Sequence, residues 1–344
     1  MNIYYKKKID QLFKKLNQTV QDKPYLVVIV LHELYRSVYD VDNYISYKIK
    51  DPKKRLNFIL EHSMKILRDF EKFGNYKVPY IRKKNKNLID KTGNVYGKLW
   101  NKMSIKSLTD GAHQILKRRF KNIKNKEFKQ KNFFSNKVVL DAGCGSGRYS
   151  NALLRFGAKK VFGIDGGKLG ISLAKKNYKN KKLNFKQENI LNTGIKSSEF
   201  DFVFCNGVLH HTSDLYRGLK EILRICKPNG FIWLYLYGTG GSFWYLRKLM
   251  NNFMKKIPED YTQNVLEILN MPMERFIFMD NWYVPIEKHS KHVDIISFLK
   301  KHNVQSIEKV MSGDSTDLEN AINDNKKHAR PMWGEGDIRL FIKR

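Results

Sequence analysis

The chain has 344 residues, of which 42% are hydrophobic and 13% aromatic, and its 65 basic against 33 acidic side chains give a net charge of +32. This length allows two domain-sized pieces, and the apolar content fits a soluble globular protein with a buried core. The strongest apolar run, residues 25–31, is far shorter than the ~20 residues of a transmembrane helix, and the N-terminus lacks the apolar segment of a signal peptide. Three cysteines without metal-ligand spacing predict a reduced, cytoplasmic protein without a metal site.

The positive charge is concentrated in the first 135 residues, which have 32 basic and 12 acidic side chains. The densest basic run lies between Lys117 and Lys131, where Glu127 is the one acid. Such a run is expected of a surface that binds RNA or another polyanion. The alternative is a solvated lysine-rich face, and the 50 lysines against 15 arginines favour it, because specific nucleic-acid contacts favour arginine.

Helices are predicted for most of residues 1–135. Apolar residues between 9 and 16 recur at the spacing of one helix face, and a second apolar stripe covers 56–67. A basic, glycine-containing connector separates this stripe from a further helix at about 105–120.

A glycine-rich loop follows the first predicted strand. The aliphatic residues 138–140 form a short buried strand, and the chain then turns through Asp141 and the glycines 143, 145 and 147 into a helix. Glycines let the backbone turn tightly and approach a ligand closely. The helix start that follows offers unpaired N–H groups and a positive dipole end. A nucleotide-like ligand is therefore predicted at this loop.

An acid ends the second predicted strand. Asp165 closes the apolar run 161–165 and stands 24 positions after Asp141. In dinucleotide-type sheets an acid at this point accepts hydrogen bonds from ribose hydroxyls. The alternative role is a capping Asp before the helix that begins near Lys168; the upstream glycine loop favours the ribose role.

Two more motifs follow in order. Phe200-Asp201 begins an apolar strand that ends before Leu209-His210-His211, and Lys227-Pro228 precedes another apolar strand. Together with the glycine loop and Asp165, these motifs resemble the class I S-adenosylmethionine-dependent methyltransferases, above all the subgroup that includes ubiquinone and menaquinone biosynthesis enzymes. The resemblance covers about residues 137–237.

The chain departs from the subgroup's pattern at two places: Glu188-Asn189-Ile190 replaces Gly-Asp-Ala, and Asn229 replaces a glycine. The resemblance implies that S-adenosylmethionine is the cofactor, with Asp165 holding its ribose and Asn189 its adenine. An amide oxygen can still accept the adenine hydrogen bond. The cofactor-binding residues that the resemblance implies are Asp141, Gly143, Gly145, Gly147, Asp165, Gly166, Asn189, Ile190, Asn206 and Val208.

The resemblance also predicts an α/β fold, a Rossmann-like seven-stranded methyltransferase sheet in residues 136–344. The helical N-terminal region, 1–135, is then expected to cover the active site. An insertion at about 241–288, rich in aromatic residues and methionine, is expected to cap the acceptor pocket.

The last predicted elements are a helix at 290–302 and strands at 304–310 and 337–342. These would be the antiparallel sixth and seventh strands that distinguish methyltransferases from dehydrogenases. A turn at 333–336 is predicted between them.

Candidate catalytic and substrate residues lie around the predicted carboxyl edge of the sheet. His211, and after it His210, follow the fourth strand, and a histidine is the natural general base if the acceptor is a hydroxyl. The alternative is that both histidines serve packing or anchor a loop. Acceptor contacts are predicted for four aromatic residues: Tyr96, Trp100, Trp282 and Tyr283. For Trp100 the alternative is a role as a core anchor.

Three functions remain open on the sequence. The favoured one is methyl transfer to an oxygen or nitrogen of a small molecule or a sugar- or lipid-linked biosynthetic intermediate. The segment 205–208 lacks the Asn/Asp-Pro-Pro-aromatic box of enzymes that methylate amino groups of nucleobases. The alternatives are an RNA methyltransferase that uses the basic N-terminal region and a non-catalytic scaffold of the same fold.

Overall fold

A computed structural model describes residues 3–39, 51–72, 105–268, 274–313 and 318–344. The chain divides into two compact units. The first, here the helical unit, comprises Met1–Lys86, Thr239–Val284 and Ser315–Gly336. The second, here the sheet unit, comprises Asn87–Gly238, Pro285–Asp314 and Asp337–Arg344.

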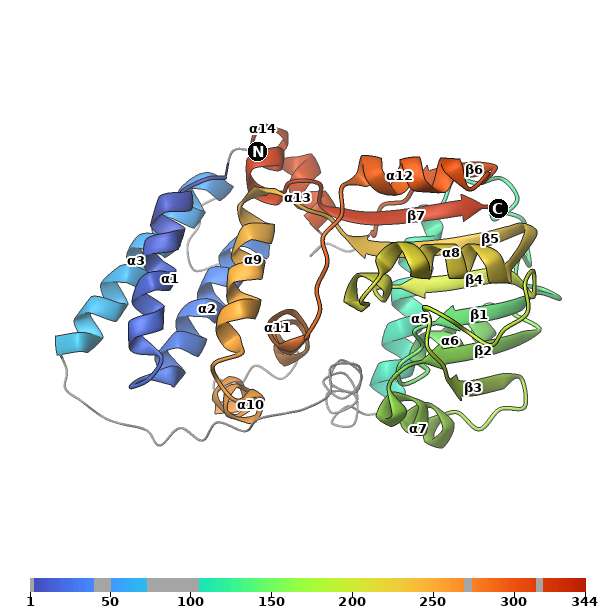
Figure 1. The fold of residues 1–344 in the computed structure, drawn as a ribbon, viewed down its shortest axis with the longest axis horizontal. Helices are drawn as coiled ribbons and strands as arrows, with labels where there is room; N and C mark the ends of the chain where they lie inside the picture. The colour runs from blue at the N-terminus through green and yellow to red at the C-terminus, as the bar shows by residue number, and fades with distance from the viewer. Residues whose placement is uncertain (1–2, 40–50, 73–104, 269–273, 314–317) are drawn as a thin grey trace. The chain divides into compact units, whose positions relative to one another are not determined.

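Seven strands form the single sheet of the sheet unit, in the order β3-β2-β1-β4-β5-β7-β6 (Figure 1). Strands β1 to β5 are parallel, and β7 is antiparallel to both β5 and β6. The predicted seven-stranded α/β sheet is thus confirmed. The strands are β1 (Val138–Ala142), β2 (Lys160–Asp165), β3 (Leu183–Gln187), β4 (Phe200–Asn206), β5 (Cys226–Tyr237), β6 (Ser306–Lys309) and β7 (Asp337–Lys343).

The predicted direction of the sixth strand is corrected. Because β6 is antiparallel to β7, it runs with the five parallel strands, and β7 alone is reversed. The chain leaves β6 and enters β7 at the same edge of the sheet, which forces the reversal. Two helices, α13 (Leu318–Asp324) and α14 (Lys326–Trp333), lie between these strands in sequence, where only a turn at 333–336 was predicted.

Helices cover both faces of the sheet. Alternate strand residues such as Val203 and Ile232 pack against α8 (Leu215–Ile225) and α12 (His292–Lys301). The opposite set, such as Phe202 and Trp233, packs against α5 (Ile105–Lys121) and α6 (Arg148–Arg155). This alternation follows from the twofold period of a strand. A fifth helix, α7 (Lys168–Asn177), packs against Phe185 of β3.

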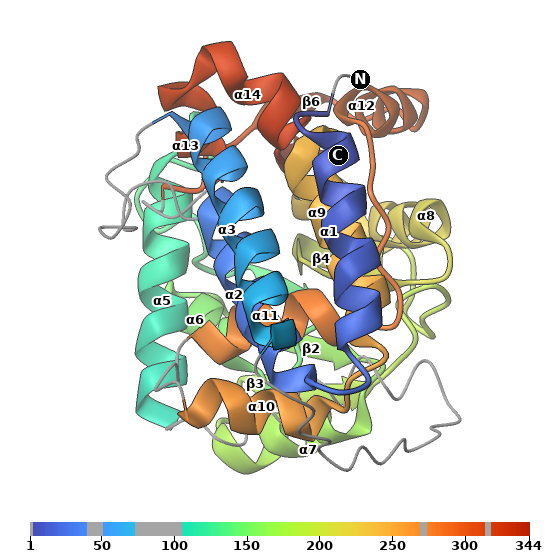
Figure 2. The same ribbon diagram turned by 90° about the vertical axis from the view of Figure 1, so that its left-hand side faces the viewer.

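Eight helices are described in the helical unit: α1 (Lys6–Thr19), α2 (Pro24–Tyr39), α3 (Pro52–Lys72), α9 (Gly241–Met254), α10 (Glu259–Ile268), α11 (Glu274–Tyr283), α13 and α14. Figure 2 shows α1 and α3 running side by side, and the two helices are in contact. Side-chain bonds join distant stretches of the chain: Trp333 Nε1 donates to the Val38 carbonyl (3.0 Å), and Asn281 Nδ2 donates to the Tyr35 hydroxyl (2.5 Å).

The unit boundary differs from the one predicted at residue 135. Helix α5 belongs to the sheet unit, because Leu116 and Phe120 pack into the apolar cluster on the sheet, where the Phe120 and Trp233 rings lie 5.9 Å apart. Within the predicted insertion 241–288, helices α9 to α11 group with the N-terminal helices, whereas residues 285–288 belong to the sheet unit. Within the described residues no helix combines the length and hydropathy that a membrane span requires.

Candidate active site

The glycine-rich loop leaves β1 in a conformation that favours glycine. Gly143, Gly145 and Gly147 have φ values of +88°, +51° and +80°, in the region that L-residues rarely adopt. A Cβ at Gly143 would lie 2.2 Å from a methyl carbon of Val208, and one at Gly147 would lie 2.8 Å from the Phe185 ring. Close packing within the protein therefore requires two of these glycines, in addition to any approach of a ligand.

Asp165 ties the glycine loop to the end of β2. Its Oδ2 accepts a hydrogen bond from Gly145 N (2.9 Å), and its Oδ1 accepts one from Gly167 N (2.7 Å). Burial raises the pKa of Asp165, and the two backbone N–H groups oppose that rise. A carboxylate has about four acceptor positions, so both oxygens can still accept bonds from hydroxyl groups. The next residue, Gly166, accepts a bond from Gln187 Nε2 (3.0 Å) through its carbonyl.

Asp165 is not the N-cap residue of the helix that follows β2. The N-cap residue of α7 is Gly167, which forms no side-chain capping hydrogen bond. Asp165 therefore orders the turn before the helix, and its carboxylate lies between this turn and the glycine loop.

Asp141 is almost completely buried below the loop. It is 2% exposed, and its Oδ2 accepts a 2.6 Å hydrogen bond from Ser150 Oγ of α6. Burial raises the pKa of Asp141 to about 7; the Ser150 bond opposes this rise, and the charge of Asp165 adds to it. A cation placed nearby would favour the ionised carboxylate. Ser150 has no motif signal of its own, and sequence reasoning missed it.

Asn189 and Ile190 lie on the loop that follows β3. Asn189 is exposed, and its Oδ1 accepts a bond from Leu191 N (3.0 Å), which leaves its amide nitrogen as a donor. Ile190 is buried in the apolar cluster beneath. The loop thus combines an exposed polar side chain with an apolar neighbour.

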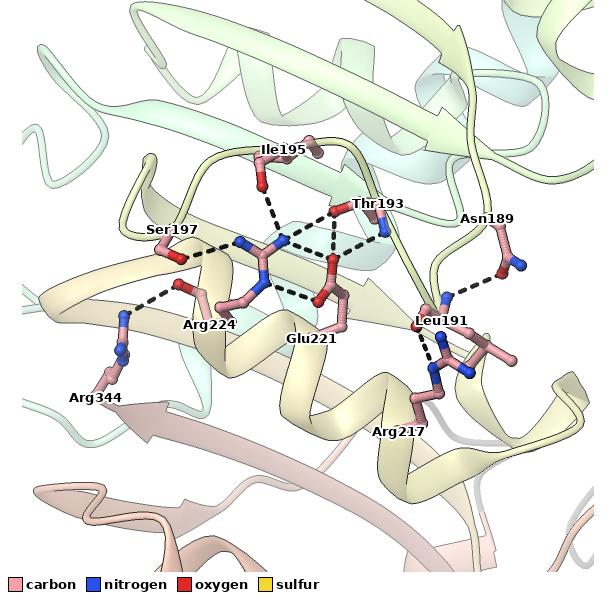
Figure 3. Close-up of polar contacts among 9 residues, drawn as sticks. All are labelled: Asn189, Leu191, Thr193, Ile195, Ser197, Arg217, Glu221, Arg224 and Arg344. Atoms are coloured by element: carbon pink, nitrogen blue, oxygen red, sulfur yellow. Dashed lines mark hydrogen bonds and ion pairs between the residues drawn. The ribbon is translucent and has the colours of Figure 1, made fainter.

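A cluster of charged side chains on α8 holds this loop in place (Figure 3). Glu221 Oε1 accepts bonds from both the backbone N (2.9 Å) and the Oγ1 (2.6 Å) of Thr193. Arg224 pairs with Glu221 and donates to the Ile195 carbonyl (2.8 Å), and Arg217 donates to the Leu191 carbonyl (2.9 Å). The Arg224 guanidinium is the main reason that the pKa of Glu221 falls to about 2.

Sequence reasoning missed this cluster. Glu221 and Arg224 stand three positions apart on a helix, which predicts an ion pair. Their loop partner, Thr193, is 28 positions away, and no local pattern connects it to the helix.

Asn206 and Val208 lie where β4 ends, at the same edge as the glycine loop. Asn206 Oδ1 accepts bonds from Trp233 Nε1 (3.0 Å) and from Arg119 Nη1 (2.9 Å). Val208 lies against Gly143, as the distance to a Cβ built there shows. Val208 is therefore brought to the loop, and Asn206 lies at the end of the same strand, where Arg119 joins it without a sequence signal.

The two histidines occupy a short 3₁₀ turn, Leu209–His211, after β4. His211 is 9% exposed, and its Nδ1 lies 2.8 Å from the Ile286 carbonyl oxygen. A carbonyl only accepts, so Nδ1 carries the hydrogen, and in the neutral ring Nε2 has the lone pair. His210 is fully buried and stacks on Tyr237, with ring centroids 3.7 Å apart.

The predicted substrate residues are placed differently. Tyr96 and Trp100 lie outside the described residues. Trp282 is fully buried in the helical unit, 4.9 Å from the Phe278 ring, and the Tyr283 hydroxyl lies 2.5 Å from Thr262 Oγ1. Contact of these two residues with an acceptor stays a prediction.

The residues at the ends of β1, β2 and β3 fit a cationic nucleoside. Asp165 offers acceptors for two hydroxyl groups, Asp141 offers a buried carboxylate that a cation would ionise, and Asn189 and Ile190 offer a polar and an apolar contact. In the described part of the chain no group of three His, Cys, Asp or Glu side chains could hold a metal ion.

Known proteins are similar to the central part of the chain. Residues 140–234 match a family model described as a methyltransferase domain. The tRNA U34 carboxymethyltransferase of Campylobacter curvus is 30% identical over 153 residues, 42% of this chain and 49% of that protein. The mitochondrial ubiquinone biosynthesis O-methyltransferase of Schizosaccharomyces pombe is 32% identical over 108 residues, 30% of this chain and 39% of that protein.

A solved structure is similar over a larger part of the chain. The S-adenosylmethionine-dependent methyltransferase from Mesorhizobium loti covers 61% of this chain and 92% of its own, with 13% identity and a TM-score of 0.41. The chain spans about half or less of the length of the two relatives named above, 49% and 39%.

Proposed function

We propose that this chain, which contains a class I S-adenosylmethionine-dependent methyltransferase domain, transfers a methyl group from S-adenosylmethionine to an acceptor oxygen or nitrogen. The acceptor proposed is a small molecule or a sugar- or lipid-linked biosynthetic intermediate. One observation supports the proposal most: Asp165 bonds to the glycine loop through Gly145 and still has acceptor positions for ribose hydroxyls.

The donor would be held by residues of four strand ends. Asp165 would accept bonds from the ribose hydroxyls, and the amide of Asn189 would contact adenine beside Ile190. The glycine loop would pass along the methionine part, and Asp141 would stabilise its positive charge through the loop. Gly166, Asn206 and Val208 would complete the pocket wall. When bound, S-adenosylmethionine supplies a methyl group on a positively charged sulfur, ready for in-line displacement.

The main task of the protein is then to orient the acceptor atom. If the acceptor is a hydroxyl, its proton must leave, and His211 is the proposed general base because its Nε2 has the lone pair. His210 is the weaker candidate, since its ring is fully buried against Tyr237. The predicted cover by the N-terminal region and the predicted aromatic cap would exclude water from the acceptor.

Donor binding tests the first half of the proposal. Calorimetric titration with S-adenosylhomocysteine should give saturable binding that weakens at least about tenfold in Asp165→Asn and in Gly145→Val. The matched control is Asp214→Asn, because Asp214 also accepts a backbone bond at a helix start, from Arg217 N (3.0 Å). Equal affinity in all four proteins would contradict the proposed donor site.

RNA is the second candidate acceptor. A relative that is 30% identical is named for its action on tRNA, and the run from Lys117 to Lys131 is strongly basic. Incubation with labelled methyl donor and fractionated cell extract, followed by mass spectrometry, separates the candidates. Label in small molecules or glycolipid intermediates supports the first, and label in an RNA fraction supports the second. Absence of label in every fraction would favour the non-catalytic scaffold.

A further inference from the structure

Two layers of side chains cross the sheet face that α5 covers. The inner layer is apolar and aromatic, with Phe204, Trp233 and Phe341 paired across β4, β5 and β7. The next layer toward the carboxyl edge of β4 and β5 is polar. It places Asn206, Tyr235 and Arg339 in register on the same three strands.

Two guanidinium groups lie over the Tyr235 ring in this polar layer. The Arg339 guanidinium carbon is 4.7 Å from the ring centroid, and that of Arg119 is 5.8 Å away. Arg339 is 4% exposed and forms a 2.8 Å ion pair with Asp337. Arg119 comes from α5 and donates to Asn206 (2.9 Å).

The charge of Arg119 is not matched by a carboxylate in the described part of the chain. Its one hydrogen bond there goes to the neutral amide of Asn206, and its buried Nε has no hydrogen-bond partner among the same residues. A half-buried guanidinium with spare donors, in a partly dehydrated layer, interacts more strongly with an anion than an exposed one does.

We propose that Arg119, beside Tyr235, forms an anion-binding subsite that takes a carboxylate or phosphate group of the methyl acceptor. The subsite deepens the proposed function and rests on it, because Asn206 joins Arg119 to the strand end where the donor pocket is proposed. A guanidinium presents a planar fork of donors that matches either anion. The acceptor is then an acidic molecule, anchored by its charge while another of its atoms is methylated.

The Trp233 indole reports on this subsite directly. Its Nε1 donates to the same Asn206 oxygen that accepts from Arg119, at 3.0 Å and 2.9 Å. We would record the indole ¹H–¹⁵N resonance of Trp233, assigned with Trp233→Phe, during titration with sodium acetate or inorganic phosphate. Sodium chloride keeps the ionic strength constant, and both titrations are run with and without saturating S-adenosylhomocysteine.

Saturable shifts with acetate, phosphate or both are expected, and they identify the anion class. Affinity should fall about tenfold in Arg119→Gln and stay unchanged in Arg155→Gln. Arg155 is a suitable control because it is an exposed arginine, paired with Asp110 at the surface. Arg119 is half-exposed, so Arg119→Gln should fold, and the titrations of the native protein test the proposal as well.

Two results would overturn the subsite. One is the absence of any saturable shift, or a shift that Arg119→Gln leaves unchanged. The other is an anion shift that S-adenosylhomocysteine abolishes, because the site would then hold the donor's own carboxylate. Binding of S-adenosylhomocysteine without binding of the anions refutes the subsite alone, whereas failure of S-adenosylhomocysteine to bind refutes the proposed function.

Discussion

We expect the free energy of unfolding to fall as the pH rises toward neutrality, because of the titration of Asp141. Its pKa in the folded protein is about 7, whereas an unfolded Asp has a pKa of about 3.9. The folded state therefore binds more protons than the unfolded state between these values, and stability declines with rising pH in that window. Each pH unit corresponds to about 1.4 kcal/mol, so the decline is about 1.6 kcal/mol from pH 5.5 to 7 and about 2 kcal/mol by pH 8.

Urea unfolding of the native protein and of Asp141→Asn at pH 5.5, 7 and 8 measures this effect. Asparagine can still accept the Ser150 hydrogen bond but does not titrate. The native protein should therefore lose about 2 kcal/mol relative to the variant between pH 5.5 and 8. Taking the difference between the two proteins removes the contribution of titrating groups that do not interact with Asp141.

Asp201→Asn is the control for this experiment. Asp201 is paired with Lys227, and its pKa is lowered, so it stays ionised throughout the window. Its difference from the native protein should not change between pH 5.5 and 8. If Asp141→Asn gives the same flat difference, Asp141 is ionised in the folded protein and the reasoning from burial is wrong.

Further substitutions test the loop and its supports. Gly143→Ala should lower the free energy of unfolding by about 2 kcal/mol or more, because φ is positive there and the new Cβ would lie too close to Val208. Adding Val208→Ala should restore part of this free energy in the same urea titration. Glu221→Gln should cost about 1–2 kcal/mol at pH 7 and weaken binding of S-adenosylhomocysteine in calorimetry. Because the pKa of Glu221 is lowered to about 2, its contribution is present above about pH 4.5 and is lost as the pH falls through 2. A cost that is the same at pH 2 as at pH 7 would contradict the ion pair. Ser150→Ala should raise the pKa of Asp141, visible as a loss of stability that continues to higher pH than in the native protein. An unchanged pH range of the loss would show that the bond contributes little.

Motif spacing predicted the sheet well because its signals are local. The apolar runs 138–140 and 161–165 and the turns that follow them identify strand ends, and parallel strands place those ends at one edge. The glycine loop, Asp165 and Val208 therefore lie together at that edge, as the motif spacing predicted. Their contact with the donor stays a prediction.

The supports of the site were not predictable in this way. Ser150, Arg119 and Thr193 belong to no motif, and each acts through a partner that only the tertiary fold brings near. The direction of β6 and the assignment of α5 to the sheet unit also depend on packing between segments that are distant in sequence. Periodicity identifies a helix face and does not identify what covers it.

Two segments of the helical unit, Thr239–Val284 and Ser315–Gly336, leave the sheet unit and return to it close to pairs of hydrogen-bonded residues. Ser290 N donates to the Tyr237 carbonyl (3.1 Å), and Val310 N donates to the Arg339 carbonyl (3.0 Å). Each of these segments therefore begins and ends within a few residues of a hydrogen-bonded pair. Short turns could replace both segments without stretching the strands, which makes a shortened sheet unit accessible to protein engineering. Such a shortened protein would test whether the proposed donor binding belongs to the sheet unit alone.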